Sequence, residues 1–352
     1  MTSPTGIPVS VLDVVPVFEG GTATDALRAT VALAPQVEQL GYRRYWVAEH
    51  HNTPSLATSA PGILVGQLAA ATTTLRVGSG GVLLPNHAPL VVAEQFGTLE
   101  ALHPGRIDLG LGRAPGTDPL TARALRRAPD RGEDDFSSQI EELSSYFAPG
   151  DPLTGIVAVP AADGRPDLWV LGSSPSSGRL AGALGLRYAF AHQINPQATE
   201  SALERYRSAF RPSRQLDRPR TLIAALVTVA EDDGTAWEVA SPYLLGKIRM
   251  RTVRRFEAFP SPHSTTRHSY SSAERSFLDD LVEPQLIGSP ATVRRKLAEL
   301  VRRTGADELM ALTVVPDQEQ RLRSFQLLAE VAADVRPGLG QEGVDDAVSV
   351  QL

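Results

Sequence analysis

The sequence contains no cysteine among its 352 residues. The protein therefore has no disulfide, no thiolate metal ligand and no thiol nucleophile. The N-terminal residues do not have the pattern of a signal peptide, because Pro8, Asp13 and Pro16 interrupt the first apolar run. No apolar run approaches the roughly 18 residues that a membrane helix needs. We therefore expect a cytoplasmic protein without a membrane partner.

A strong excess of one charge is missing as well. The formal net charge is -6, which gives no reason to expect nucleic acid as a partner. What the chain does have is a hydrophobic share of 42%, which is enough over this length to bury a sizeable core. The length by itself allows either one large barrel or two ordinary domains.

Short β-branched apolar runs alternate with longer amphipathic stretches along the chain. The runs predict eight strands, at residues 9–18, 42–48, 75–84, 106–111, 168–171, 188–192, 221–230 and 307–315. The stretches between and after them predict helices, at residues 23–40, 59–73, 88–102, 133–147, 176–184, 196–210 and 317–335. This alternation favours an α/β fold, a (β/α)8 TIM barrel closed by right-handed crossovers. A doubly wound open sheet is the competing architecture.

The connection between the seventh and eighth predicted strands is far longer than a simple crossover, at about 75 residues. Within it, residues 257–272 are rich in Ser, Pro, His and Thr and have no periodicity, which is typical of a mobile lid or a disordered segment. We expect residues 1–335 to form a single barrel domain with this insertion. Residues 336–352 should form a flexible tail.

The candidate site lies at the carboxyl ends of the strands, where barrels of this kind place their active sites. The second predicted strand ends in Glu49, His50 and His51. A histidine at this position can act as an acid or base, because imidazole titrates near neutrality. The two histidines can also be metal ligands or ordinary loop residues. No second histidine cluster with metal-ligand spacing supports the metal alternative.

Glycine and arginine mark the next two strand ends. Gly80 and Gly81 interrupt the third strand, which indicates a bulge or a close backbone approach. They leave clearance for a flat ring, or simply allow a bend of the barrel. Arg113 follows the fourth strand, and its guanidinium group suits phosphate oxygens. Arg123 can bring a second cation to the same place, although both arginines can equally be surface charges.

The fifth strand ends in a loop rich in small hydroxyl residues. Gly172, Ser173, Ser174 and Ser177 lie where a helix is expected to begin. Such a loop can bind an anion through its hydroxyls and the helix N-terminus, or it can be an ordinary serine N-cap. Taken together, the four strand ends predict a site for a phosphorylated planar cofactor beside an imidazole.

At these residues the sequence resembles the luciferase-like flavin-dependent monooxygenases. The likeness extends from about residue 8 to residue 334 and is carried by residues 45–51, 76–85, 103–113, 169–174, 287–290 and 305–308. The chain is more similar to the single-subunit bacterial oxidoreductases of metabolism and natural-product pathways than to the light-emitting enzymes. The reactive cysteine of the light-emitting members is absent, and so is an acidic residue that some relatives have in the phosphate loop.

The resemblance implies roles for particular residues. It makes His50 the catalytic histidine near the reactive edge of the flavin, and it makes Gly80-Gly81 the site of a non-prolyl cis peptide against the flavin ring. It assigns the cofactor phosphate to Arg113, Arg123 and the loop with Gly172, Ser173, Ser174 and Ser177. No metal is implied.

The resemblance also implies an activity. Reduced FMN and O2 would oxidise a small organic substrate through a flavin hydroperoxide. Because the sequence has no dinucleotide-binding fingerprint, a separate flavin reductase would deliver reduced FMN in a transient encounter. A homodimer through the helices after strands two and three is implied by the resemblance alone.

Three other functions stay open from the sequence. The first is a deazaflavin-dependent oxidoreductase that transfers hydride without oxygen. The second is a flavin-binding protein without catalysis. The third is a metal-dependent barrel hydrolase built on His50 and His51.

Overall fold

A computed structural model describes residues 6–114, 116–125, 133–147, 156–161, 164–252 and 258–336 of the chain. Eight parallel strands form a closed barrel in which each strand pairs with the next and the last pairs with the first. The strands are β1 (Val9–Asp13), β2 (Arg44–Val47), β3 (Arg76–Leu83), β4 (Ile107–Gly112), β5 (Asp167–Gly172), β6 (Arg187–Ala191), β7 (Thr221–Val229) and β9 (Glu308–Leu312). The predicted (β/α)8 TIM barrel is confirmed, and the open sheet is excluded.

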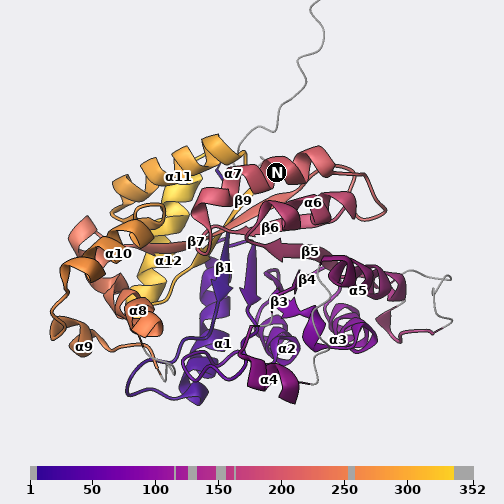
Figure 1. Cartoon of the computed structure of the whole chain (residues 1–352), viewed down its shortest axis with the longest axis horizontal. Coiled ribbons are helices and arrows are strands. Elements are labelled where there is room, and N and C mark those ends of the chain that lie inside the picture. Colours follow the sequence, from indigo (N-terminus) through magenta and orange to yellow (C-terminus); the bar gives the residue numbers. More distant parts are fainter. Residues whose placement is uncertain are drawn as a thin grey trace, which may run out of the picture.

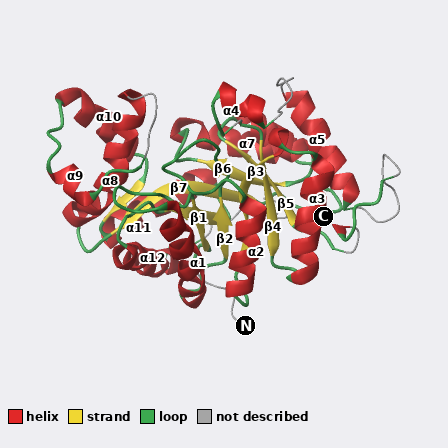
Figure 2. Ribbon diagram, turned by 90° about the horizontal axis from the view of Figure 1, so that it is seen from below, coloured by secondary structure: helices red, strands yellow, loops and turns green. Residues whose placement is uncertain are grey.

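Helices surround the barrel and follow its strands (Figures 1 and 2). They are α1 (Ala23–Gln39), α2 (Pro61–Ala71), α3 (Pro89–Leu102), α4 (Pro119–Ala124), α5 (Glu133–Tyr146), α6 (Pro175–Ala183), α7 (Thr199–Ala209), α11 (Pro290–Thr304) and α12 (Gln318–Ala333). Five of them have proline in the first turn, where its missing N–H leaves no hydrogen bond unmade. None of the described helices is long and apolar enough to cross a membrane.

The first strand is shorter than predicted, because it ends at Asp13 rather than at Phe18. Val15 has a φ of 49°, in the left-handed region that a β-branched residue rarely adopts. The Asp13 carboxylate accepts a hydrogen bond of 2.8 Å from the Val15 backbone N–H, which holds the turn. The apolar run beyond Asp13 is therefore a loop, and it turns Val14 toward the barrel mouth.

The long connection after β7 is mostly helical. It contains α8 (Asp233–Thr252), α9 (Pro262–Thr266), α10 (Ser272–Val282) and β8 (Leu286–Gly288), and β8 pairs with the outer end of β7. Both views show α8, α9 and α10 together at one side of the barrel (Figures 1 and 2).

Two signals for these helices were present in the sequence and were missed. Alanine or a larger apolar residue recurs every fourth position on the buried side of α8, at Ala236, Ala240, Leu244 and Ile248. The pair Ser271 and Glu274 forms a capping box at the start of α10.

The predicted lid, residues 257–272, lies within the described residues from residue 258 onward. Its backbone is joined to the loop after β1, because the Phe259 N–H donates to the Val17 carbonyl and the Glu19 N–H donates to the Phe259 carbonyl, both at 2.8 Å. The Glu19 carboxylate also accepts from Arg249 and from the Ser261 N–H. Whether this segment moves stays a prediction. The predicted flexible tail lies outside the described residues from residue 337 onward.

A chain of charged side chains crosses the base of the barrel. Arg44 of β2 donates to Asp108 of β4 at 2.6 Å and to Glu308 of β9 at 2.7 Å, and all three side chains are buried. Arg76 of β3 continues the chain from Asp108 to Asp167 of β5, with contacts of 2.6 and 2.9 Å. Burial alone would raise the pKa of Asp108, but Arg44 and Arg76 hold it below its usual range.

Replacement of the central arginine should destabilise the fold. Arg44→Met leaves two buried carboxylates without their main counter-charge, so we expect the free energy of unfolding to fall by about 3–5 kcal/mol. Urea unfolding followed by circular dichroism measures this loss. The control is Arg303→Met, which breaks the exposed ion pair with Glu200 and should have a much smaller effect. Equal stabilities of the two variants would show that the Arg44 contacts do not hold the barrel.

Candidate functional site

One cavity of about 470 Å³ opens at the carboxyl ends of the strands. This volume lies in the range of cofactor and substrate sites. The cavity is lined by residues from all four strand ends that the sequence singled out: His50, Gly80, Gly81, Arg113, Gly172, Ser173, Ser174 and Ser177. Its floor is apolar and includes Leu12, Trp46, Met310 and Leu312. The closed sheet thus brings together residues that lie more than 120 positions apart in the chain.

His50 lies directly after β2 and lines this cavity. Its backbone N–H donates to the Thr58 carbonyl at 2.8 Å, which fixes the strand end. The Nδ1 atom of its imidazole is buried and has no hydrogen-bond partner among the described residues. Burial lowers the pKa of His50 below its ordinary value, although the neighbouring Glu49 opposes the shift. A neutral imidazole with one unsatisfied nitrogen is therefore available to a bound molecule.

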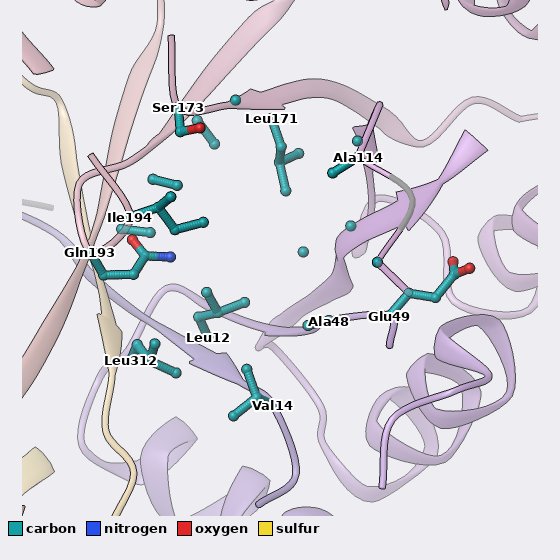
Figure 3. A pocket seen from close by; sticks show the side chains of 18 of the residues that line it. Leu12, Val14, Ala48, Glu49, Ala114, Leu171, Ser173, Gln193, Ile194 and Leu312 are labelled. Atoms are coloured by element: carbon teal, nitrogen blue, oxygen red, sulfur yellow. The ribbon is translucent and has the colours of Figure 1, made fainter. Parts of the chain in front are cut away.

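Glu49 is the buried partner of two other histidines. Its carboxylate accepts from His51 Nε2 at 2.8 Å, from His87 Nε2 at 2.9 Å and from the Leu83 N–H at 3.0 Å. Burial alone would raise the pKa of Glu49, but these hydrogen bonds hold it below its usual range. Figure 3 shows the carboxylate turned away from the middle of the cavity. Glu49 therefore anchors the loops around the site.

The histidine pair is split between two roles. His51 is held by Glu49, whereas His50 faces the cavity. Within the part of the chain that the structure describes, no three His, Cys, Asp or Glu side chains lie close enough together to hold a metal ion. The arrangement thus separates a residue that supports the loop from a residue that can meet a ligand.

The Gly80–Gly81 peptide bond is cis, as the family resemblance implies. The pairing of β3 with β4 shifts register between Gly80 and Val82, which is the irregularity that the two glycines predicted. A Cβ atom on Gly80 would lie 2.7 Å from Leu12 Cδ1, and one on Gly81 would lie 2.7 Å from the Gly110 carbonyl oxygen. A larger residue at position 81 would therefore collide with backbone, whereas one at position 80 would have to displace the end of the Leu12 side chain, and the bare backbone of both forms part of the cavity wall.

The two predicted phosphate arginines lie in different places. Arg113 follows β4, is exposed and lines the cavity. Arg123 is exposed near the end of α4 and is not one of the residues that line the cavity. The structure thus brings Arg113, but not Arg123, to the same cavity as the serine loop.

The serine loop begins α6 as an N-cap. Ser174 is the N-cap residue, and its hydroxyl accepts from the Ser177 N–H at 3.4 Å. The Ser177 hydroxyl donates to the Ser174 carbonyl at 2.6 Å and also contacts the Tyr188 hydroxyl at 2.8 Å. A Cβ atom on Gly172 would lie only 2.0 Å from the Ser177 oxygen, so Gly172 makes room for this contact. Because the Ser177 proton is already used, Ser173 and Ser174 are better placed to donate to an anion.

Sequence reasoning missed a second set of cavity residues. Gln193 and Ile194 come from the loop after β6, and Figure 3 shows the Gln193 amide pointing into the cavity. Gln193 Oε1 is buried and has no partner among the described residues. The insertion contributes the rest, Tyr243, Lys247 and Met250 of α8 and Phe259 beyond it. Tyr243 and Lys247 are four positions apart and so share one helix face, a signal that the sequence did contain.

The residues present fit a flavin mononucleotide. The cavity is mostly apolar and offers bare backbone at Gly80 and Gly81, which suits a flat ring. His50 Nδ1 and Gln193 Oε1 are buried polar atoms that need a partner. Arg113 together with the start of α6 can receive a phosphate.

The burial of His50 should be visible in its titration. Because desolvation disfavours the imidazolium, we expect the pKa of His50 in the folded protein to lie below the value of about 6.5 in unfolded chains. Histidine NMR signals followed against pH measure it, and His50→Ala identifies the signal among the seven histidines. A pKa above that of the urea-unfolded protein would contradict the buried, neutral imidazole.

Comparison with known proteins gives the family. The profile of the luciferase-like monooxygenases matches residues 8–308. The chain is 40% identical to the luciferase-like monooxygenase of Escherichia coli strain K12, over 94% of this chain and 98% of that protein. It is 34% identical to the N-acetyl-S-alkylcysteine monooxygenase of Bacillus subtilis strain 168, over 92% of this chain and 98% of that protein.

Solved structures share the fold. The crystal structure of apo-MsnO8 superposes with a TM-score of 0.82 at 38% identity, over 94% of this chain and 99% of that chain. The FMN complex of the oxygenating constituent of a Pseudomonas putida diketocamphane monooxygenase gives a TM-score of 0.71 at 20% identity, over 93% and 98% of the two chains. A secondary alcohol dehydrogenase that depends on coenzyme F420 gives 0.66 at 13% identity, over 93% and 99%. At 20% and 13% identity, the likenesses to the diketocamphane monooxygenase and to the alcohol dehydrogenase show the fold alone. By its profile match and its relatives, this chain belongs to the luciferase-like monooxygenase family.

Proposed function

We propose that the protein is a monooxygenase that uses reduced FMN and O2 to oxidise a small organic substrate. Its family supports a monooxygenase role. That the cofactor is FMN is our own, more specific proposal. The observation that carries it is that three features line one cavity. They are the unsatisfied His50 imidazole, the bare Gly80–Gly81 backbone, and Arg113 together with the serine loop. One fold neighbour holds FMN.

The chain's own residues would divide the work. Reduced flavin, when bound, supplies the electrons that activate O2. Ser173, Ser174 and Arg113 would hold the phosphate, and Gly80–Gly81 would support the ring. His50 would accept or donate a proton at Nδ1, since its neutral form is favoured by burial. The roles of Arg123 and Ser177 in phosphate binding remain predictions.

Water exclusion is the second requirement of this chemistry. Leu12, Trp46 and Leu312 form an apolar floor, and Phe259 packs at the mouth against Phe18, with ring centroids 5.6 Å apart. An apolar enclosure protects a reactive centre from hydrolysis and strengthens electrostatic interactions inside it. This arrangement suits a reaction in which oxygen is transferred to the substrate and water must be kept away from the reactive centre.

The partners belong to the same proposal. A separate reductase would supply reduced FMN. We also propose a homodimer in the cytoplasm, formed through α2 and α3. On these helices Val92, Phe96 and Leu99 are buried in the barrel's own core, whereas Ile63 and Val91 are 75% and 46% exposed. The exposed residues are the ones available to a second copy.

The central test compares two reduced cofactors under anaerobic conditions. We expect reduced FMN to bind, and admission of labelled O2 to place labelled oxygen in the product. N-acetyl-S-alkylcysteines are the first substrates to test, because one relative is a monooxygenase of that class. His50→Ala should keep its affinity for FMN but lose turnover by about 10²–10⁴-fold. Binding of a reduced deazaflavin with oxygen-independent hydride transfer, and no binding of FMN, would contradict the proposal.

Arg113 should matter only for cofactors with a phosphate. Arg113→Ala removes a charge-assisted contact of about 1.5–3 kcal/mol, and the lower end is expected because the side chain is exposed. The affinity for FMN should therefore fall about tenfold or more, while the affinity for riboflavin, which lacks the phosphate, should not change. Fluorescence titration measures both. Unchanged FMN affinity would remove Arg113 from the phosphate site, and Arg123→Ala tests the other predicted arginine in parallel.

A further inference from the structure

Lys247 is a cavity residue to which the mechanism assigns no role. It is one of only two lysines in the chain. Among the described residues that line the cavity, Lys247 and Arg113 are the only lysine or arginine side chains. Lys247 is half-buried on α8, and burial lowers the pKa of its ammonium group. A cation placed in a largely apolar cavity costs free energy unless an anion compensates it.

No anion of the chain compensates this cation within the described residues. Lys247 Nζ lies over the ring of Tyr243, 5.9 Å from its centroid. Among the described residues that line the cavity, the one carboxylate belongs to Glu49, which is already bound by His51 and His87. The described residues therefore leave this charge uncompensated, and a bound molecule can supply the negative charge.

Lys247 also lies on the side of the mouth opposite the predicted phosphate site. Arg113 and the serine loop follow β4 and β5, which face β9 and β1 across the eight-stranded barrel. Tyr243, four positions before Lys247, packs against Phe259 at 5.5 Å, and Phe259 packs against Phe18 in the loop after β1. The ammonium therefore belongs to the β1 side of the cavity, away from the serines.

We propose that Lys247 determines the substrate class by binding the carboxylate of an organic acid whose apolar part packs against Tyr243, Met250 and Phe259. This inference rests on the proposed function, since it assigns the flavin to the other side of the same cavity. The acid would enter as a carboxylate and keep that group through the reaction, so Lys247 binds and orients but does not transfer a proton. Oxidation would occur on the apolar part of the molecule.

The test uses matched acids and amides on the protein saturated with oxidised FMN. The probes are hexanoate, octanoate and phenylbutyrate, each beside its primary amide, and binding is measured by calorimetry. We expect at least one acid to bind about tenfold or more tightly than its amide. The preference should disappear in Lys247→Met, return in Lys247→Arg, and persist in the control Lys296→Arg, which changes the other lysine outside the cavity on α11.

A second readout does not depend on affinity. Reductive methylation with labelled formaldehyde keeps the charge of both lysines and gives each an NMR signal, which the two Lys→Arg variants assign. The acid, but not its amide, should move the Lys247 signal and leave the Lys296 signal in place.

Each failure has its own signature. If FMN does not bind, the proposed function fails. If FMN binds and no acid is preferred over its amide, or the preference survives Lys247→Met, the inference about Lys247 is wrong. If Lys247→Met weakens FMN but not riboflavin, Lys247 serves the cofactor phosphate and the inference is overturned as well.

Discussion

Charged side chains at the base of the barrel are the constraint on which the remaining structure depends. A continuous set of contacts joins seven of the eight strands, running through Ser10, Glu308, Arg44, Asp108, Arg76, Asp167 and Arg187. Each of these residues is the first or second of its strand. These contacts therefore tie the strands together at their beginnings.

Trp46 contacts both the charged residues at the base of the barrel and the candidate site. Its indole N–H donates to Asp108 at 2.9 Å, while its ring lines the floor of the cavity. A Cβ atom on Gly80 would lie 3.1 Å from Trp46 Cβ, so the same side chain also restricts the size of the residue at position 80 on the neighbouring strand β3. The charge network at the base of the barrel therefore holds one residue of the cavity floor in place.

Much of this organisation could be predicted because it depends on local patterns. Strand and helix periods predicted the barrel, and Gly80, Gly81 and the serine loop stood out because glycine and serine have definite backbone and capping roles. One error occurred where distant contacts override a local pattern. The first strand stops at Asp13, since its carboxylate is held by Thr30, Tyr45 and Arg321 and bonds the Val15 N–H. The helix α8 was missed although its buried stripe was present in the sequence.

The sequence by itself determined the fold class and the residue types at four strand ends, because hydrophobic period and glycine placement act over a few neighbouring residues. Only the tertiary structure decided that His51 is held by Glu49, that Arg113 reaches the cavity while Arg123 does not, and that Gln193 and Lys247 join it. The physical reason is that burial, pairing and charge compensation are properties of three-dimensional neighbours. Those neighbours here come from strands on opposite sides of a closed sheet.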